Sequence, residues 1–167
     1  PHWHRARHIA WLSVFASLLI ARCARPPVAE GQNGLKNNFW AGRLALQVES
    51  DPPQSFHAGF ELKGTAHTGE LSLFSPLGNT LAVLNWSPQA ATLNSGGTVR
   101  EFSSLDTLVA QATGTPIPIP ALFAWLAGDQ ASATGWAADL SQLADGRLVA
   151  RRTDPLPTAV LRVALER

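Results

Sequence analysis

The side chains capable of nucleophilic or acid–base chemistry are few and scattered in this sequence. Cys23, the one cysteine, follows an apolar segment near the N-terminus, whereas a catalytic thiol needs a histidine positioned beside it in a fold. His57 lies on the polar side of an alternating segment and His67 lies beside a turn, so we interpret both as exposed and inert. Glu61 and Glu70 can pair across a predicted hairpin, but a solvated strand face explains them better than a pair of catalytic carboxylates.

Motifs of the common enzyme classes are absent from the sequence. The chain contains no GxSxG, no HExxH and no phosphate-binding GxxxxGK[ST] segment. A single cysteine forms neither an intramolecular disulfide nor a metal site of the cysteine type. We therefore expect no enzymatic activity, no cofactor and no metal.

The composition indicates one apolar domain. Only 15% of the 167 residues are charged, against roughly 25% in an average globular protein, and this length suffices for a sizeable core. The formal net charge is +1, and from Ala24 onward the chain has 10 basic and 12 acidic residues. No basic stripe alternates with aromatic residues, so we expect no nucleic-acid partner.

The first 22 residues have the pattern of a secretory signal peptide. Residues 1–8 are basic and aromatic, and the 13 residues 9–21 carry no charge. A membrane-spanning helix needs about 20 apolar residues, so the run is short for a span and typical of an export signal. The alternatives are a helix buried in the domain and an uncleaved membrane anchor.

The cysteine that follows this segment suggests a lipid modification. Cys23 resembles the acceptor cysteine of bacterial lipoproteins, whose sulfur receives a diacylglycerol, although Arg22 stands where a small residue is usual. Residues 23–38 contain Pro, Gly and Asn and are interpreted as a lipidated N-terminus and linker.

From Phe39 onward, apolar and polar residues alternate with a period of two, which is typical of half-buried strands. Leu44, Leu46 and Val48 form the first such apolar series. Turns of hairpin length separate successive series, which implies an antiparallel meander. The predicted strands cover residues 39–49, 56–63, 70–73, 80–86, 91–93, 99–102, 136–140, 148–152 and 159–166.

Two helices are predicted after residue 102, between the sixth and seventh of these strands. The first covers Leu105–Ala112, with Ser103 or Ser104 as its N-cap and Gly114 as its end. One antiparallel sheet with both helices on its apolar face accounts for the order of elements, and so long a sheet should curl. The predicted fold is mainly β (α+β), with a single domain over residues 39–167.

The stretch from Gly114 to Gly128, GTPIPIPALFAWLAG, contains the second helix. Its alternating prolines lock φ and remove N–H donors, so we expect an extended segment until Pro120 begins a helix over Ala121–Ala127. Gly128 suits a left-handed helix end. Because this helix is apolar around most of its circumference, it is either a core helix or a lid over an apolar cavity.

The turn between the third and fourth predicted strands carries an unusual leucine. Pro76 suits the second position of a β-turn, and Gly78 can adopt a positive φ. Leu77 stands between them, where a polar residue is expected. Either Leu77 folds back into the core, or it is a hydrophobic finger that enters lipid or touches a partner.

Four pieces of the chain together resemble the LolB family of outer-membrane lipoprotein receptors. Their order and spacing cover nearly the whole sequence, from the leader to the last strand. They are FWAGR at 39–43, LFSPLGNT at 73–80, TGTPIPI at 113–119 followed by Leu122, Trp125, Leu126 and Gly128, and the leader that ends in Cys23.

This resemblance implies a curved, incompletely closed antiparallel β-barrel with short helices covering an apolar cavity. It implies a receptor, lipid-anchored through Cys23 on the periplasmic face of the outer membrane, that accepts triacylated lipoproteins from the periplasmic carrier LolA. The receptor would insert them into the inner leaflet of that membrane. Its protruding leucine matches Leu77, with Pro76 and Gly78 beside it. We expect a monomer whose partners are LolA, lipoproteins and outer-membrane lipid.

The residues placed in the acyl-chain cavity are apolar members of the strands and of the Gly114–Gly128 stretch. They are Leu44, Leu46, Phe60, Leu62, Leu71, Leu73, Ile117, Ile119, Phe123, Trp125 and Leu126. Two alternatives stay open: a soluble periplasmic lipid or lipoprotein carrier of similar fold, and a lipid-modifying enzyme. The missing nucleophile–base pair argues against the enzyme.

Overall fold

A computed structural model of the protein describes residues 38–113 and 115–166. The predicted signal peptide, Cys23 and the predicted helix end at Gly114 lie outside the described residues, as does the linker up to residue 37. Residues 35–167 form one compact unit. Within the described ranges, no helix is long and apolar enough to cross a membrane.

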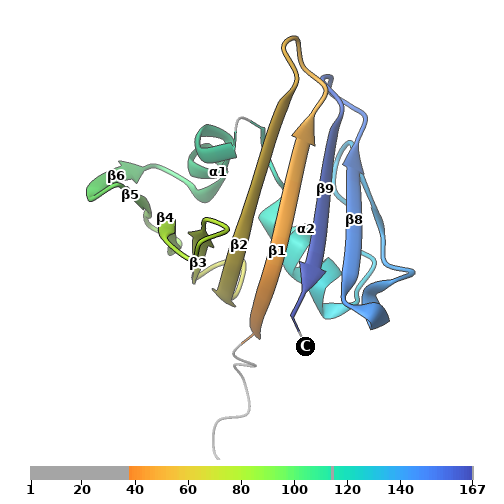
Figure 1. Ribbon diagram of the computed structural model, residues 1–167, viewed down its shortest axis with the longest axis horizontal. Coiled ribbons are helices and arrows are strands. Elements are labelled where there is room, and N and C mark those ends of the chain that lie inside the picture. The colour runs from red at the N-terminus through yellow and green to blue at the C-terminus, as the bar shows by residue number, and fades with distance from the viewer. Residues whose placement is uncertain (1–37, 114, 167) are drawn as a thin grey trace, which may run out of the picture. The chain divides into compact units, whose positions relative to one another are not determined.

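One antiparallel sheet contains every strand of the described residues, as predicted (Figure 1). Its strand order is β6-β5-β4-β3-β2-β1-β9-β8-β7, so the last long strand pairs with the first. The sheet curves but does not close, because its two edges are β6 and β7. The strands are β1 (Asn38–Val48), β2 (Gln54–Gly64), β3 (Gly69–Phe74), β4 (Thr80–Trp86), β5 (Ala91–Ser95), β6 (Thr98–Phe102), β7 (Trp136–Asp139), β8 (Arg147–Arg152) and β9 (Ala159–Leu165).

Two α-helices lie on the concave side of the sheet, where they cover its apolar face. Helix α1 (Leu105–Thr113) packs beside β5 and β6, and α2 (Ile119–Ala127) lies behind β1 and β9 in the view of Figure 1. A short 3₁₀ helix, η1 (Leu143–Asp145), precedes β8. The predicted mainly β fold with covering helices is therefore confirmed.

The ends of the helices follow local chemistry that the sequence indicates. Ser104 caps α1, since its hydroxyl oxygen accepts a hydrogen bond from the Thr107 N–H at 3.2 Å. Helix α2 ends at Gly128, whose φ of 92° is left-handed as predicted. It begins at Ile119, slightly earlier than predicted, because the Pro118 carbonyl already accepts the helical bond from the Leu122 N–H at 2.9 Å.

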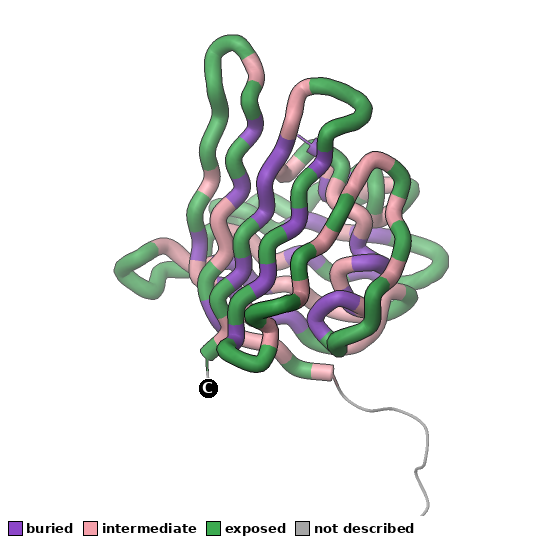
Figure 2. The backbone as a smooth tube through the Cα atoms, turned by 90° about the vertical axis from the view of Figure 1, so that its right-hand side faces the viewer, coloured by how far each residue is buried: buried purple, intermediate pink, exposed green. Residues whose placement is uncertain are grey.

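The core lies between the concave face of the sheet and the helices. Buried and exposed residues alternate along the strands (Figure 2), as the period of two predicts. Strands β1 and β9 approach each other so closely at Gly42 that a Cβ atom there would collide with the Ala164 carbonyl oxygen. Among the described residues, the buried core residues fall between Leu46 and Val163. Residues 35–167, which form one compact unit, are therefore expected to fold independently.

Candidate functional site

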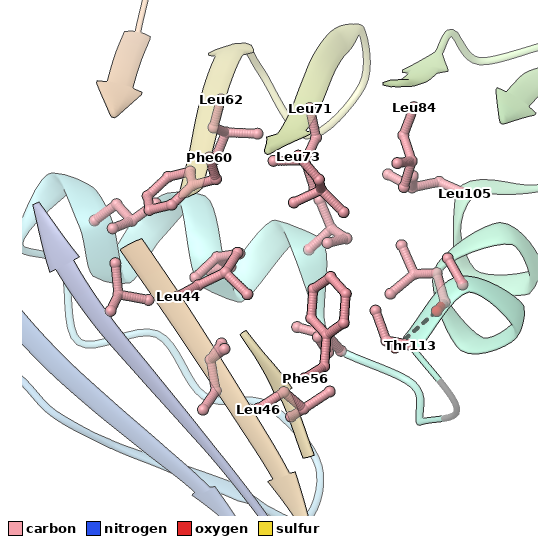
Figure 3. A pocket seen from close by; sticks show the side chains of 18 of the residues that line it. Leu44, Leu46, Phe56, Phe60, Leu62, Leu71, Leu73, Leu84, Leu105 and Thr113 are labelled. Atoms are coloured by element: carbon pink, nitrogen blue, oxygen red, sulfur yellow. Dashed lines mark hydrogen bonds between the residues drawn. The ribbon is translucent and has the colours of Figure 1, made fainter. Parts of the chain in front are cut away.

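An apolar cavity of about 60 Å³ lies between the sheet and the two helices. Its wall combines the inward faces of five strands with one side of each helix and the segment that connects them (Figure 3). The wall consists of Leu44, Leu46, Phe56, Phe60, Leu62, Leu71, Leu73, Leu84, Trp86, Leu105, Val109, Ala112, Thr113, Ile117, Ile119, Leu122, Leu126, Leu161 and Val163.

The wall is apolar because each strand and each helix turns its apolar side toward the cavity. On β2, Phe60 and Leu62 point inward, while Glu61 between them points to the opposite face of the sheet. On α2, Ile119, Leu122 and Leu126 are three and four residues apart and so lie on one side of the helix. The arrangement offers a ligand an apolar surface without directional partners.

The polar atoms that approach this wall are already bonded to the protein. The Thr113 hydroxyl lies 2.8 Å from the Val109 carbonyl oxygen (Figure 3) and 2.7 Å from that of Thr115. The Trp86 indole N–H donates to the Thr65 carbonyl at 3.0 Å. Both groups therefore satisfy their hydrogen bonds away from the cavity, and their apolar parts complete the wall.

Most of the residues predicted to form the cavity meet in its wall. Those that line it are Leu44, Leu46, Phe60, Leu62, Leu71, Leu73, Ile117, Ile119 and Leu126. Phe123 and Trp125, which the prediction also included, do not line it. Their spacing is compatible with the cavity side of α2, since Phe123 is four residues from Ile119 and Trp125 is three from Leu122. Contacts with other parts of the domain keep both side chains out of the wall.

Phe123 and Trp125 fix α2 in place. The Phe123 ring packs edge-on against Trp40 and Trp86, with centroid distances of 5.6 and 6.2 Å. The Trp125 side chain is fully buried, and its indole N–H donates to the Ala131 carbonyl at 2.8 Å. The two interpretations of α2 therefore describe different sides of it: one side is core, and the other covers the cavity.

The cavity wall also contains residues that the sequence did not predict, two of them because of a long-range strand pairing. Leu161 and Val163 lie opposite Leu46 and Leu44 because β9 pairs with β1, a pairing between the two ends of the domain that no local pattern reveals. Phe56 could have been predicted from the sequence, since it lies four residues before Phe60 and therefore on the same face of the strand. The other residues that were missed are Leu84, Trp86, Leu105, Val109, Ala112, Thr113 and Leu122.

The cavity is much smaller than a ligand-filled site. Its volume is about 60 Å³, whereas pockets for drug-sized ligands measure about 300–1,000 Å³. A ligand of that size therefore fits only if the helices and the sheet separate.

The turn between β3 and β4 holds Leu77 outside the core. The Gly78 N–H donates to the Ser75 carbonyl at 2.9 Å, and the Ser75 N–H donates to the Asn79 carbonyl at 2.8 Å. Gly78 has a φ of 83°, which a glycine can adopt because it has no Cβ atom. Leu77 is 89% exposed, so the alternative in which it folds back into the core is wrong.

The titratable side chains form no evident reactive cluster in the part of the chain that the structure describes. His57 and His67 are exposed. Glu61 and Glu70 do not form a carboxylate pair but share Lys63, whose Nζ lies 3.3 and 3.6 Å from their oxygens. No group of three or more metal-ligating residues occurs among the described residues.

The comparison with known proteins agrees with this geometry. The profile of the family described as "Outer membrane lipoprotein LolB" matches residues 39–155. The outer-membrane lipoprotein LolB of Bordetella petrii is 32% identical over 180 residues, which cover 93% of this chain and 90% of that protein. The LolB of Cupriavidus pinatubonensis is 30% identical over 159 residues, which cover 92% of this chain and 76% of the relative.

The matched range begins one residue into β1 and continues through β8, with both helices. It therefore includes most of the cavity wall and the whole Leu77 turn. With the curved open sheet, the two covering helices and these matches taken together, the chain belongs to the LolB family of outer-membrane lipoproteins.

Proposed function

We propose that the protein is an outer-membrane receptor that accepts lipoproteins from the periplasmic carrier LolA and inserts them into the inner leaflet of the outer membrane. The observation that carries the proposal is an apolar cavity between the sheet and two helices in a member of the LolB family. The acyl chains of the lipoprotein occupy this cavity after the helices move away from the sheet. The protein acts as a monomer and forms no covalent bond with its cargo.

The physical character of the wall suits acyl chains of varied cargo. Each buried CH₂ group contributes about 0.8 kcal/mol whatever protein carries it, and an apolar wall does not distinguish one lipoprotein from another. Handover from the carrier requires only that the receptor hold the same chains more favourably. A difference of about 1.4 kcal/mol already biases the transfer tenfold.

Acceptance is tested by mixing residues 35–167 with LolA that carries a radiolabelled triacylated lipoprotein. We expect the label to move from the carrier to the receptor in the absence of membranes. If the folded receptor takes up no lipoprotein, the proposed function is wrong.

Delivery to the membrane is tested at the exposed leucine. Leu77→Glu should leave folding and acceptance intact, because the side chain contacts solvent, and should impair insertion of the cargo into vesicles. Full burial of a leucine side chain is worth about 1.5–3 kcal/mol, so insertion should fall at least tenfold. Leu156→Glu is the matched control, because Leu156 is also exposed, at 78%. Equal delivery by the two variants would contradict a role of Leu77 in insertion.

The membrane anchor distinguishes a receptor from a soluble carrier of similar fold. We propose that Cys23, which lies outside the described residues, is acylated and holds the protein on the periplasmic face of the outer membrane. Growth with a radioactive fatty acid should label the parent protein and not a Cys23→Ser variant. An unlabelled parent would instead favour the soluble carrier.

A further inference from the structure

The convex face of the sheet, opposite the cavity, contains a basic hollow. It has a volume of about 690 Å³, and its floor consists mainly of β1, β2, β8 and β9. Three arginines line it, Arg43, Arg147 and Arg162, together with His57. All four side chains are exposed. We call this site the basic hollow.

The register of the strands creates both the depth and the charge of the basic hollow. Arg43 on β1 lies between Gly59 of β2 and Ala164 of β9, and Ala164 in turn lies beside Arg147 of β8. A long cationic side chain therefore alternates with a very small one across this row. The small residues lower the floor, and the arginine side chains line the hollow beside them.

The next row of the sheet repeats this arrangement. Ala45 of β1 lies between His57 of β2 and Arg162 of β9. The Arg162 guanidinium donates a hydrogen bond to the Gln47 side-chain oxygen at 2.6 Å, which holds it over the sheet. Since a guanidinium has five N–H donors, most of its donors stay available to a ligand.

The positive charge of the basic hollow contrasts with the excess of acidic residues in the domain. The described residues include seven Lys and Arg against eleven Asp and Glu, yet three of the seven cations line this one site, where Glu166 is the acidic residue. Among the described carboxylates, none lies within 4 Å of Arg43, Arg147 or Arg162. By contrast, Lys63 on the same face of β2 is paired with two carboxylates.

The basic hollow borders the turn that carries Leu77. Ser75 and Pro76 belong to its lining, and Leu77 is the next residue along the chain. An exposed apolar side chain beside unpaired guanidinium groups matches the boundary of a phospholipid leaflet, where phosphates lie just above the acyl chains. An acidic protein surface would match the arginines but not the adjoining leucine.

We propose that the basic hollow binds the phosphate groups of anionic phospholipids and so sets the convex face of the sheet against the membrane while Leu77 enters it. This inference rests on the proposed function for the role of Leu77, but the binding of phosphate groups does not depend on cargo. Arginine is suited to the task because its planar fork binds phosphate oxygens in pairs.

The test is the sedimentation of residues 35–167 with vesicles, without carrier or lipoprotein. The parent should bind vesicles of phosphatidylcholine mixed with phosphatidylglycerol more tightly than vesicles of phosphatidylcholine alone. Each cation near an anionic surface contributes about 1 kcal/mol, or about fivefold in partition, so Arg162→Gln should weaken binding about fivefold. The triple variant with Arg43→Gln, Arg147→Gln and Arg162→Gln should lose about 100-fold and approach the level on phosphatidylcholine.

Arg100→Gln is the matched control, because it removes the same exposed charge from β6 at the edge of the sheet. It should change the partition by less than about twofold, since the Debye length is about 10 Å at 0.1 M salt. Circular dichroism and thermal melts establish that each variant is folded.

Three outcomes would overturn the proposal: parent binding that is independent of phosphatidylglycerol, a loss in Arg100→Gln equal to that in Arg162→Gln, or unchanged binding by the folded triple variant. If the triple variant keeps vesicle binding but loses uptake from LolA, the hollow serves a protein partner instead, and the proposal is also wrong. Because the vesicle assay contains no cargo, failure of lipoprotein acceptance would reject the proposed function without affecting this result.

Discussion

Removal of one cavity side chain should make the protein less stable and yet a better acyl binder. Leu126 lines the cavity from α2 and is 5% exposed. Leu126→Ala enlarges a space of about 60 Å³ that the closed protein cannot refill completely. Buried Leu→Ala substitutions cost about 3 kcal/mol or more, which for a domain of this size corresponds to a fall in Tm of about 10 °C.

The same substitution should favour the acyl-bound state. A bound chain fills the space that Leu126 left, so the loss of packing falls mainly on the ligand-free protein. If the whole of about 3 kcal/mol were recovered, affinity would rise roughly 100-fold, which is the upper bound. The assay is titration of residues 35–167 with a fluorescent fatty acid, followed by thermal melts with and without the ligand.

Leu93→Ala is the control for this experiment. Leu93 is 3% exposed on β5 and is not part of the cavity wall, so its removal should cost similar stability and leave fatty-acid affinity within about twofold. The reasoning is refuted if Leu126→Ala binds the fatty acid no more tightly than Leu93→Ala. The acyl chain would then occupy a different site.

Three further predictions concern the framework around the cavity. Trp125→Phe should destabilise the domain by about 2–3 kcal/mol in denaturant unfolding, since it leaves the Ala131 carbonyl without its donor; an unchanged midpoint would contradict the anchoring role of Trp125. Gly42→Ala should lower the free energy of unfolding by about 3 kcal/mol, because the new methyl group forces β1 and β9 apart. Hydrogen exchange of the amides between these two strands should become faster, and unchanged exchange rates would refute the close approach. Hydrogen bonds from the Ser141 hydroxyl and backbone N–H lower the pKa of Asp139 below its ordinary value of 3.8. The Asp139 carboxylate therefore stabilises the fold above pH 3.8, and this stabilisation is lost as the pH falls through the pKa of the folded protein. Asp139→Asn should accordingly make stability less dependent on pH in this acidic range. An NMR titration midpoint of Asp139 at or above 3.8 would contradict the lowered pKa.

Much of the fold could be predicted from the sequence because its determinants are local. A period of two predicts strands, and the inward phase of each strand identifies most of the cavity wall. Prolines mark the beginning of α2, and Gly128, which adopts the left-handed conformation, marks its end. The prediction that one antiparallel sheet carries two helices on its apolar face needed no more than these patterns.

Other features depend on contacts between distant parts of the chain. Pairing of β1 with β9 brings Leu161 and Val163 into the cavity wall. It also places Arg43 in the same row as Arg147 on the convex face, with Ala164 between them. Neither group is recognisable locally, because the residues are more than 100 positions apart and each alone resembles an ordinary strand residue.

The direction in which each apolar side chain points also depends on the tertiary structure. The sequence by itself determined that α2 is apolar nearly all round, but not which side of it meets the cavity. Packing against Trp40 and Trp86 turns Phe123 away, and a hydrogen bond to Ala131 holds Trp125 in the core. Likewise, only the backbone bonds of the β3–β4 turn decided that Leu77 points into solvent, because a leucine between Pro76 and Gly78 fits both a buried and an exposed turn.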